Sequence, residues 1–206
     1  MQKIIIFLLC CFFLASCAAG QSQPKSKKKA EIPAESIRIN DYFPIANRIN
    51  SYKGEGNEFA TYEEAFFEYK DSYLSSIVEN GGTRTFKVYQ VTNEGIYLVY
   101  EQHEYYEEAP LPIDAIKSQF KPVALLTAPL KVGNKFNNWE ITDVHAELNL
   151  PIGKLKNVII TEKRDEKSQT WTKNYWAPEY GLVKTEFTST AEKDPFIVTS
   201  ELEKIN

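Results

Sequence analysis

One stretch of the sequence combines an imidazole with two carboxylates at a spacing that suits metal binding. Asp143, His145 and Glu147 recur at every second residue, so on a β-strand their side chains would share one face, about 6–7 Å apart. Imidazole nitrogens and carboxylate oxygens are ligands of divalent metals. The alternative is the polar face of an amphipathic strand with a neutral histidine. One strand supplies too few ligands alone, so a metal site here would need further residues.

A second charged stretch could bind a cation or a positively charged partner. It contains Glu101, His103 and Glu104, followed by two tyrosines and two more glutamates, close to a proline-rich break in the chain. Such a run of charge is also typical of a solvated strand end or loop. Binding and simple solvation both stay open for this stretch.

The sequence carries no motif that indicates an enzyme. All three cysteines lie at or before position 17, so the rest of the chain has no thiol nucleophile, thiolate metal ligand or disulfide. A Gly-x-Ser-x-Gly nucleophile motif and a glycine-rich phosphate loop are both absent. We therefore expect no enzymatic activity and no cofactor. A metal-dependent enzyme that uses the region of His145 stays open as an alternative, ranked after the two non-enzymatic functions given below.

The charge is unevenly distributed along the 206 residues. The whole chain has 24 basic and 28 acidic side chains, for a net charge of −4. Residues 1–30 hold five lysines and no acid, which leaves 19 basic and 28 acidic side chains in residues 31–206, a net of −9. Nucleic-acid binding needs a basic surface that neutralises phosphates. The acidic remainder therefore argues against a nucleic-acid partner.

The first 17 residues have the pattern of an export signal that ends in a lipidation site. Lys3 precedes an apolar run over residues 4–14, which is too short for a comfortable membrane span and suits a secretory signal. The tetrapeptide Leu14-Ala15-Ser16-Cys17 resembles the lipobox of bacterial lipoproteins. The resemblance implies that residues 1–16 are a signal peptide and that Cys17 carries the lipid. An ordinary signal peptide with a chance cysteine is the alternative.

A short linker follows the lipidation site. Residues 17–34 contain small, polar and charged side chains without apolar periodicity, which is typical of a disordered, lysine-rich tether. Residues 35–206 are expected to form a single domain. Several acyl chains on one cysteine would give stable anchoring. We therefore expect the protein at the cell membrane or outer membrane, on the face away from the cytoplasm.

The domain is predicted to be all-β and mainly antiparallel. Short runs rich in Val, Ile, Thr and aromatic residues are separated by turn residues, a pattern that favours a curved sheet, a half-barrel or a sandwich. At most a short helix fits the chain, around residues 113–119. The predicted strands are residues 85–91, 95–101, 141–150, 158–163, 170–176, 182–188 and 196–202.

Two segments are harder to assign. In residues 59–77 aromatic and apolar side chains recur every three or four residues, which favours a helix, but Asp71 and Ser72 also fit a turn between two strands. Periodicity leaves both possibilities open. In residues 37–57, glycines and a proline indicate turns rather than a long helix.

Four segments resemble the landmarks of a group of uncharacterised bacterial lipoproteins of low-GC bacteria. They are residues 52–60, 80–83, 129–134 and 175–184, the last with a Tyr-aromatic-Ala-Pro-x-x-Gly-Leu-Val-Lys pattern. The resemblance implies a curved antiparallel sheet and two strands in residues 59–77, and it implies no activity. Independently of it, the turn at residues 177–181 would bring Trp176 opposite Leu182 on neighbouring strands.

These observations lead to one expected function and two alternatives. We expect a lipid-anchored lipoprotein of the cell envelope that acts as a non-enzymatic binding or assembly module. Its partners would be the membrane, through the lipid, and an envelope protein or an apolar ligand. The first alternative is a carrier of a lipid or another apolar ligand in a concave cleft of the sheet. The second is the metal-dependent enzyme.

Overall fold

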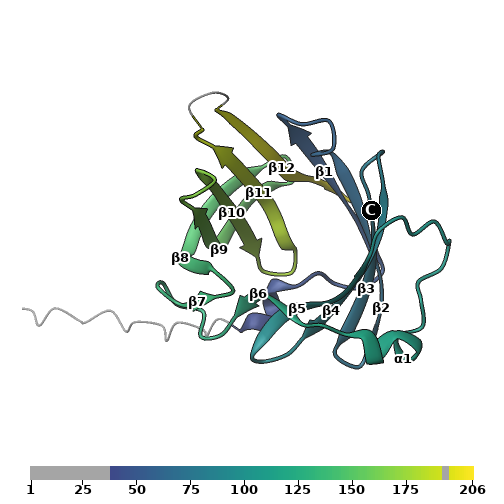
Figure 1. The fold of residues 1–206 in the computed structure, drawn as a ribbon. Coiled ribbons are helices and arrows are strands. Elements are labelled where there is room, and N and C mark those ends of the chain that lie inside the picture. Colours follow the sequence, from purple (N-terminus) through teal and green to yellow (C-terminus); the bar gives the residue numbers. More distant parts are fainter. Residues whose placement is uncertain (1–37, 192–194) are drawn as a thin grey trace, which may run out of the picture. The chain divides into compact units, whose positions relative to one another are not determined.

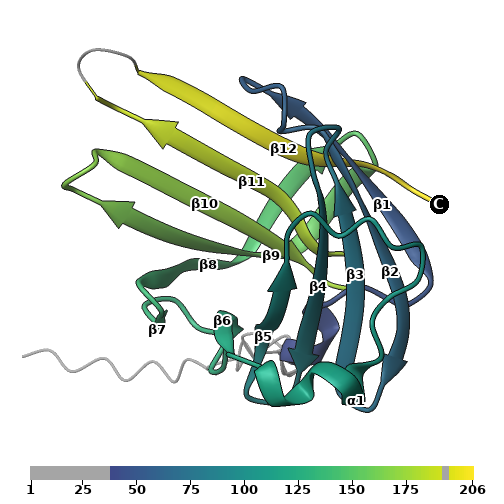
Figure 2. The ribbon, with the colours of Figure 1, turned by 45° about the vertical axis from the view of Figure 1, so that its right-hand side comes forward.

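The computed structural model describes residues 38–191 and 195–206 (Figure 1). Within these residues twelve strands form one antiparallel sheet, and the helices are short. The prediction of an all-β, mainly antiparallel curved sheet is confirmed (Figure 2). The signal peptide predicted for residues 1–16, the lipidation of Cys17 and the tether of residues 17–34 lie outside the described residues.

The strands follow the chain in two meanders. β1 to β6 each pair with the next strand, as do β7 to β12, and β1 pairs with β12 to join the two halves into the order β6-β5-β4-β3-β2-β1-β12-β11-β10-β9-β8-β7. The strands are β1 Arg48–Glu55, β2 Tyr62–Lys70, β3 Tyr73–Glu79, β4 Arg84–Val91, β5 Gly95–Gln102, β6 Val123–Thr127, β7 Lys135–Phe136, β8 Trp139–Leu150, β9 Gly153–Asp165, β10 Thr170–Ala177, β11 Gly181–Ser189 and β12 Phe196–Ile205. The helices are η1 Ile39–Tyr42, α1 Ile113–Ile116 and η2 Lys117–Gln119.

Residues 59–77 form two strands, β2 and β3, and the helical alternative is wrong. The turn between them lies at Asp71, whose φ of 55° is left-handed and is tolerated by aspartate. A register shift between Phe66 and Tyr69 moves the later aromatic residues relative to the earlier ones. This β-bulge explains why the spacing of the aromatic residues resembled a helix.

Several predicted turns are confirmed. Gly81, with a φ of 79°, lies between β3 and β4, and residues 92–94 connect β4 to β5. The turn at residues 177–181 joins β10 to β11 and places Trp176 opposite Leu182, as expected. Gly181 has a φ of 78°, and a side chain there would collide with Pro44, so this position requires glycine.

Three strands were missed by the sequence analysis: β1, β6 and β7. β1 lies in residues 37–57, where only turns were predicted. Its buried residues include Asn50 beside Tyr52, so the strand lacks an apolar alternation. β6 has five residues directly after Pro122, and β7 has only two. Such short strands carry too few residues to show a period of two.

β8 does not have the single solvent-exposed face that its alternation of polar and apolar residues predicted. Ile141 is fully buried and Thr142 is exposed, whereas His145 and Glu147 are exposed further along the strand. Register shifts against β9 separate these positions, and each β-bulge exchanges the two faces of the strand. Ile141 therefore does not share a face with His145.

Apolar side chains are buried on both sides of the sheet. The concave side holds a cluster that joins η1 to β2, β4, β9 and β10 and includes Phe43, Phe66 and Trp176. On the outer side, Phe86 and Val88 of β4 are fully buried beneath the segment that contains α1. Figure 1 shows this segment running outside the sheet between β5 and β6.

Candidate functional site

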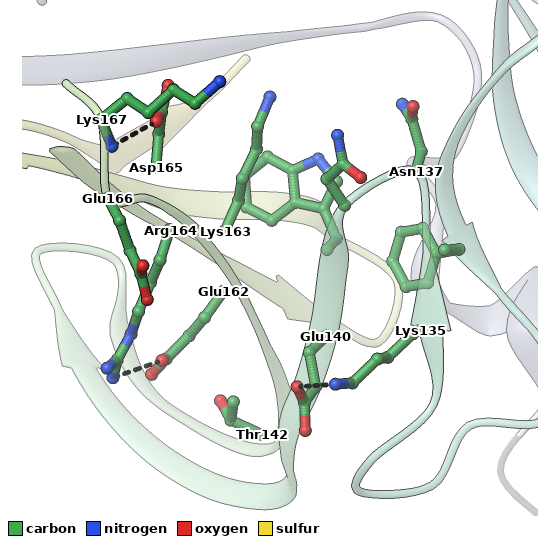
Figure 3. Close-up of a pocket in the computed structure, with 13 residues that line it drawn as sticks. Lys135, Asn137, Glu140, Thr142, Glu162, Lys163, Arg164, Asp165, Glu166 and Lys167 are labelled. Carbon is green, nitrogen blue, oxygen red and sulfur yellow. Dashed lines mark hydrogen bonds and ion pairs between the residues drawn. The ribbon is translucent and has the colours of Figure 1, made fainter. Parts of the chain in front are cut away.

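An open groove of about 1260 Å³ lies between the β7–β8 hairpin and the end of β9 (Figure 3). Its lining is a mixture of charged, amide and aromatic side chains. The lining residues are Lys135, Phe136, Asn137, Asn138, Trp139, Glu140, Thr142, Glu162, Lys163, Arg164, Asp165, Glu166 and Lys167.

The groove exists because β9 is longer than the strand beside it. The pairing of β8 with β9 ends at Glu140 and Glu162, so the backbone of β9 continues through Asp165 without a strand on that side. The tight turn between β7 and β8 contains Asn137 and Asn138 with φ values of 44° and 65°. Asparagine adopts these left-handed conformations more easily than most residues, so two residues are enough to reverse the chain between β7 and β8.

Ion pairs hold several of the lining side chains. Lys135 pairs with Glu140 at 3.2 Å, and Arg164 pairs with Glu162 at 3.5 Å (Figure 3). Lys163 forms no ion pair with any described residue. The groove therefore combines two ion pairs with charged side chains, among them Lys163, Glu166 and Lys167, that form none with a described residue.

The turn at the tip of the β9–β10 hairpin is fixed by Asp165. Its Oδ1 accepts hydrogen bonds from the backbone N–H groups of Lys167, at 2.9 Å, and Ser168, at 3.3 Å. Hydrogen bonds from Ser168 and then Lys167 hold the pKa of this carboxyl below its usual range. The carboxyl of Asp165 therefore holds the hairpin turn as an ionised acceptor of backbone hydrogen bonds.

Two of the three candidate metal ligands, Asp143 and Glu147, have side chains that are engaged elsewhere. The backbone N–H of His145 donates to Asp143 Oδ1 at 2.8 Å, and Glu147 forms an ion pair with Lys154. The hydrogen bond from Lys154 lowers the pKa of Glu147. Within residues 38–191 and 195–206, no group of three or more His, Cys, Asp or Glu side chains converges as a metal site would require.

The second predicted cluster is spread along the end of β5. Glu101 lies 3.7 Å from Lys87 and 3.9 Å from the His103 Nε2, and the Thr85 hydroxyl lies 3.2 Å from the His103 Nδ1. Glu104, with a φ of 52°, is in the following turn. A second groove, of about 580 Å³, lies beside β5 and β6. Its lining includes Glu101 but neither His103 nor Glu104.

A small cavity of about 50 Å³ lies on the concave side of the sheet. It is lined by Phe43, Pro44, Tyr52, Glu64, Phe66, Tyr89, Leu125, Trp176 and Leu182. Pockets that enclose small molecules usually measure about 300–1,000 Å³. This cavity is therefore far smaller than an acyl chain needs.

Glu64 is the residue of this cavity that the sequence analysis missed. It is buried on β2, between the inward-facing Tyr62 and Phe66. A signal was present, because Glu64 lies two residues from Tyr62 and two from Phe66 and so shares their face of a β-strand. The neighbouring Glu63, on the opposite face, is exposed.

Buried tyrosines surround the same side of the sheet. Burial, followed by the charge of Asp41, raises the pKa of Tyr42 to about 12, and its hydroxyl donates to the Asn157 carbonyl at 2.7 Å. Burial is also the main cause of the raised pKa of Tyr62 and of Tyr89, with the charge of Glu64 adding to both.

We expect the protein to lose stability between pH 10 and about pH 12. Unfolded tyrosines ionise near pH 10, whereas the folded chain keeps these protons to higher pH. Above pH 10 the unfolded state thus binds fewer protons, so the free energy of unfolding falls as pH rises. Urea titrations at pH 9 to 12 would measure this. Tyr42→Phe should make the fall shallower, and Tyr106→Phe, at an exposed tyrosine, should leave it unchanged.

Among the described residues, no helix is long and apolar enough to cross a membrane.

The chain is similar to some known proteins in structure but not in sequence. No family model matches the sequence. No curated protein matches it either. Two solved structures are similar to this chain. A candidate exported protein with a YmcC-like fold from Bacteroides fragilis has 12% identity and a TM-score of 0.48, with 80% of this chain and 98% of that one covered. A candidate lipoprotein from Parabacteroides distasonis has 14% identity and a TM-score of 0.45, with the same coverage.

Proposed function

We propose that this protein is a lipid-anchored lipoprotein of the cell envelope that binds a protein partner, without catalysis, through the groove beside β9. The observation that carries the proposal is the open groove of about 1260 Å³ along an unpaired length of strand. An open, mixed-charge surface of this kind suits a macromolecular partner better than an enclosed small molecule.

The lipid anchor of the proposal rests on the sequence. Residues 14–17 resemble a lipobox, and acylation of Cys17 would hold the domain at a membrane surface through the linker of residues 17–34. A protein confined to a surface in this way meets envelope partners at a raised effective concentration. Anchoring would therefore favour a moderate-affinity binding module.

The partner that suits the groove is an extended segment of an envelope protein that adds as a strand to β9. An unpaired strand edge offers main-chain hydrogen bonds to such a segment. Charged side chains along an edge discourage pairing with arbitrary chains, and Lys163, Arg164 and Asp165 have this role in β9. A segment with an acidic side chain opposite Lys163 would overcome this barrier, so the charges supply specificity.

Site-specific crosslinking in intact cells tests the proposal. A photoreactive amino acid at Asn138, on the rim of the groove, is expected to give one defined adduct with an envelope protein. The same probe at Asp71, in the β2–β3 turn, serves as the matched control and should give none. Equal adducts from both positions would show that the groove has no special role.

We expect Lys163→Glu to weaken the binding. Reversing this charge replaces an attraction with a repulsion, which should lower the yield of the Asn138 adduct about five-fold, equivalent to about 1 kcal/mol. Lys204→Glu, at an exposed position of β12 outside the groove, makes the same change in net charge and should leave the yield unchanged. A similar loss in both variants would indicate a general charge effect instead of a local one.

A further inference from the structure

The small concave cavity contains a buried carboxylate that forms no ion pair with a described residue. Glu64 is only 8% exposed, and its Oε1 accepts hydrogen bonds from the Ser76 hydroxyl at 2.6 Å and the Tyr89 hydroxyl at 2.8 Å. Among the described residues no Lys, Arg or His forms an ion pair with Glu64. No described residue of any type donates a hydrogen bond to the Glu64 Oε2. A buried carboxylate is normally compensated by a positive charge, because an isolated one is costly to remove from water.

A second buried acceptor lies next to Glu64 without a partner. Asn50 is directly opposite Glu64 in the pairing of β1 with β2 and is fully buried. Its Nδ2 donates to the Tyr52 hydroxyl at 3.3 Å, whereas its Oδ1 has no hydrogen bond within the described part of the chain. Orphaned buried acceptors of this kind are rare in folded proteins. The Asn50 Oδ1 is thus an orphaned acceptor at the position paired with Glu64, although Asn50 is not among the residues that line the cavity.

Aromatic rings form much of the cavity wall, together with Pro44, Leu125 and Leu182. Phe43 and Tyr89 meet edge to face, with ring centroids 5.0 Å apart, and Phe43 meets Phe66 in the same way at 6.2 Å. Trp176 also lines the cavity. Aromatic faces stabilise cations through the negative potential above the ring. The carboxylate supplies the full counter-charge, so the lining is complementary to an organic cation.

We propose that this cavity binds a small primary ammonium ion, with Glu64 as its counter-ion. A primary ammonium group donates hydrogen bonds, and the carboxylate of Glu64 in the cavity wall is an acceptor for one of them. The volume of about 50 Å³ is several times the 10–15 Å³ that one water requires, so it admits a group of the size of methylammonium. A metal cation such as Ca²⁺ needs at least six oxygen ligands, more than this aromatic lining offers. The site is separate from the groove beside β9 and does not depend on its function.

Thermal melting of the full-length lipoprotein in detergent tests the proposal. Methylammonium chloride at tens of millimolar is expected to raise the melting temperature by roughly 3 °C over sodium chloride at the same ionic strength. Glu64→Gln keeps the shape of the side chain and removes its charge, so the difference between the two salts should vanish. Glu63→Gln, on the exposed face of the same strand, is the matched control and should keep the full difference.

A second measurement does not depend on any variant. In nuclear magnetic resonance spectra of the same protein, ¹³C-labelled methylammonium should give nuclear Overhauser contacts to ring protons of Tyr89 and Trp176, which line the cavity. Absence of these contacts at saturating methylammonium would overturn the proposal, as it would indicate a cavity that holds only water. An equal rise of the melting temperature in sodium chloride, or a rise retained in Glu64→Gln, would overturn it as well.

Discussion

Cys17→Ser is expected to release the protein from the membrane fraction into the soluble fraction. The thiol of Cys17 is the group to which the lipid would be attached, and serine cannot form the thioether. Two or more acyl chains make attachment nearly irreversible on the time scale of cell fractionation. The change should therefore be close to complete. Metabolic labelling with a fatty-acid analogue, followed by fractionation, measures both acylation and location.

The other two cysteines provide the control for this prediction. Cys10 and Cys11 lie in the apolar part of the proposed signal peptide and would be removed with it. Replacing either with serine should leave labelling and membrane location unchanged. Persistent fatty-acid label in Cys17→Ser would contradict the lipobox interpretation, and so would a loss of label in the other two variants.

The parts of the fold that the sequence predicted are those governed by local chemistry. The β3–β4 turn requires a left-handed residue, which Gly81 supplies, and the β10–β11 turn has the same requirement at Gly181. Between such turns, β-branched and aromatic residues fill the strands. Local rules of this kind also fixed the pairing of Trp176 with Leu182.

The missed features depend on contacts between distant parts of the chain. β1 joins the two halves of the sheet by pairing with β12, about 150 residues later. Its inner face carries Asn50 beside Tyr52 because the concave side contains a polar cluster around Glu64. A strand that buries amide and carboxylate groups has no apolar alternation to detect. The sequence pattern therefore indicated only the turns near it.

The candidate site shows the same division. The period of two correctly placed Asp143, His145 and Glu147 on a strand. It gave no information about the neighbouring strand, where Lys154 forms an ion pair with Glu147. The groove beside β9 arises from the unequal lengths of β8 and β9. That difference becomes visible only once the register of the two strands is known, so residues such as Lys163 could not be selected beforehand.

The burial of β4 on both faces leads to a prediction for Phe86. The residue pattern predicted the strand β4, but whether its outer face contacts water depends on the segment that carries α1. Phe86 is 0% exposed, packs against Tyr105 with ring centroids 5.0 Å apart, and lies in one cluster with Ile113 and Ile116. Phe86→Ala should reduce the free energy of unfolding by about 3–5 kcal/mol, because it removes a buried ring and leaves a cavity. Urea titration of the full-length protein measures the loss.

Phe196→Ala is the matched control, since it deletes the same side chain from a position that is 48% exposed. Its cost should stay near or below about 1 kcal/mol, because half of the ring already contacts water. A similar small cost at Phe86 would mean that the α1 segment does not cover the sheet in solution and that the outer face of β4 is open. A loss of about 3–5 kcal/mol is a large fraction of the 5–15 kcal/mol typical of a domain. Such a loss would show that the α1 segment is a second layer that stabilises the sheet. Because the sheet would then be stable by itself, its β9 edge could stay free to bind a partner.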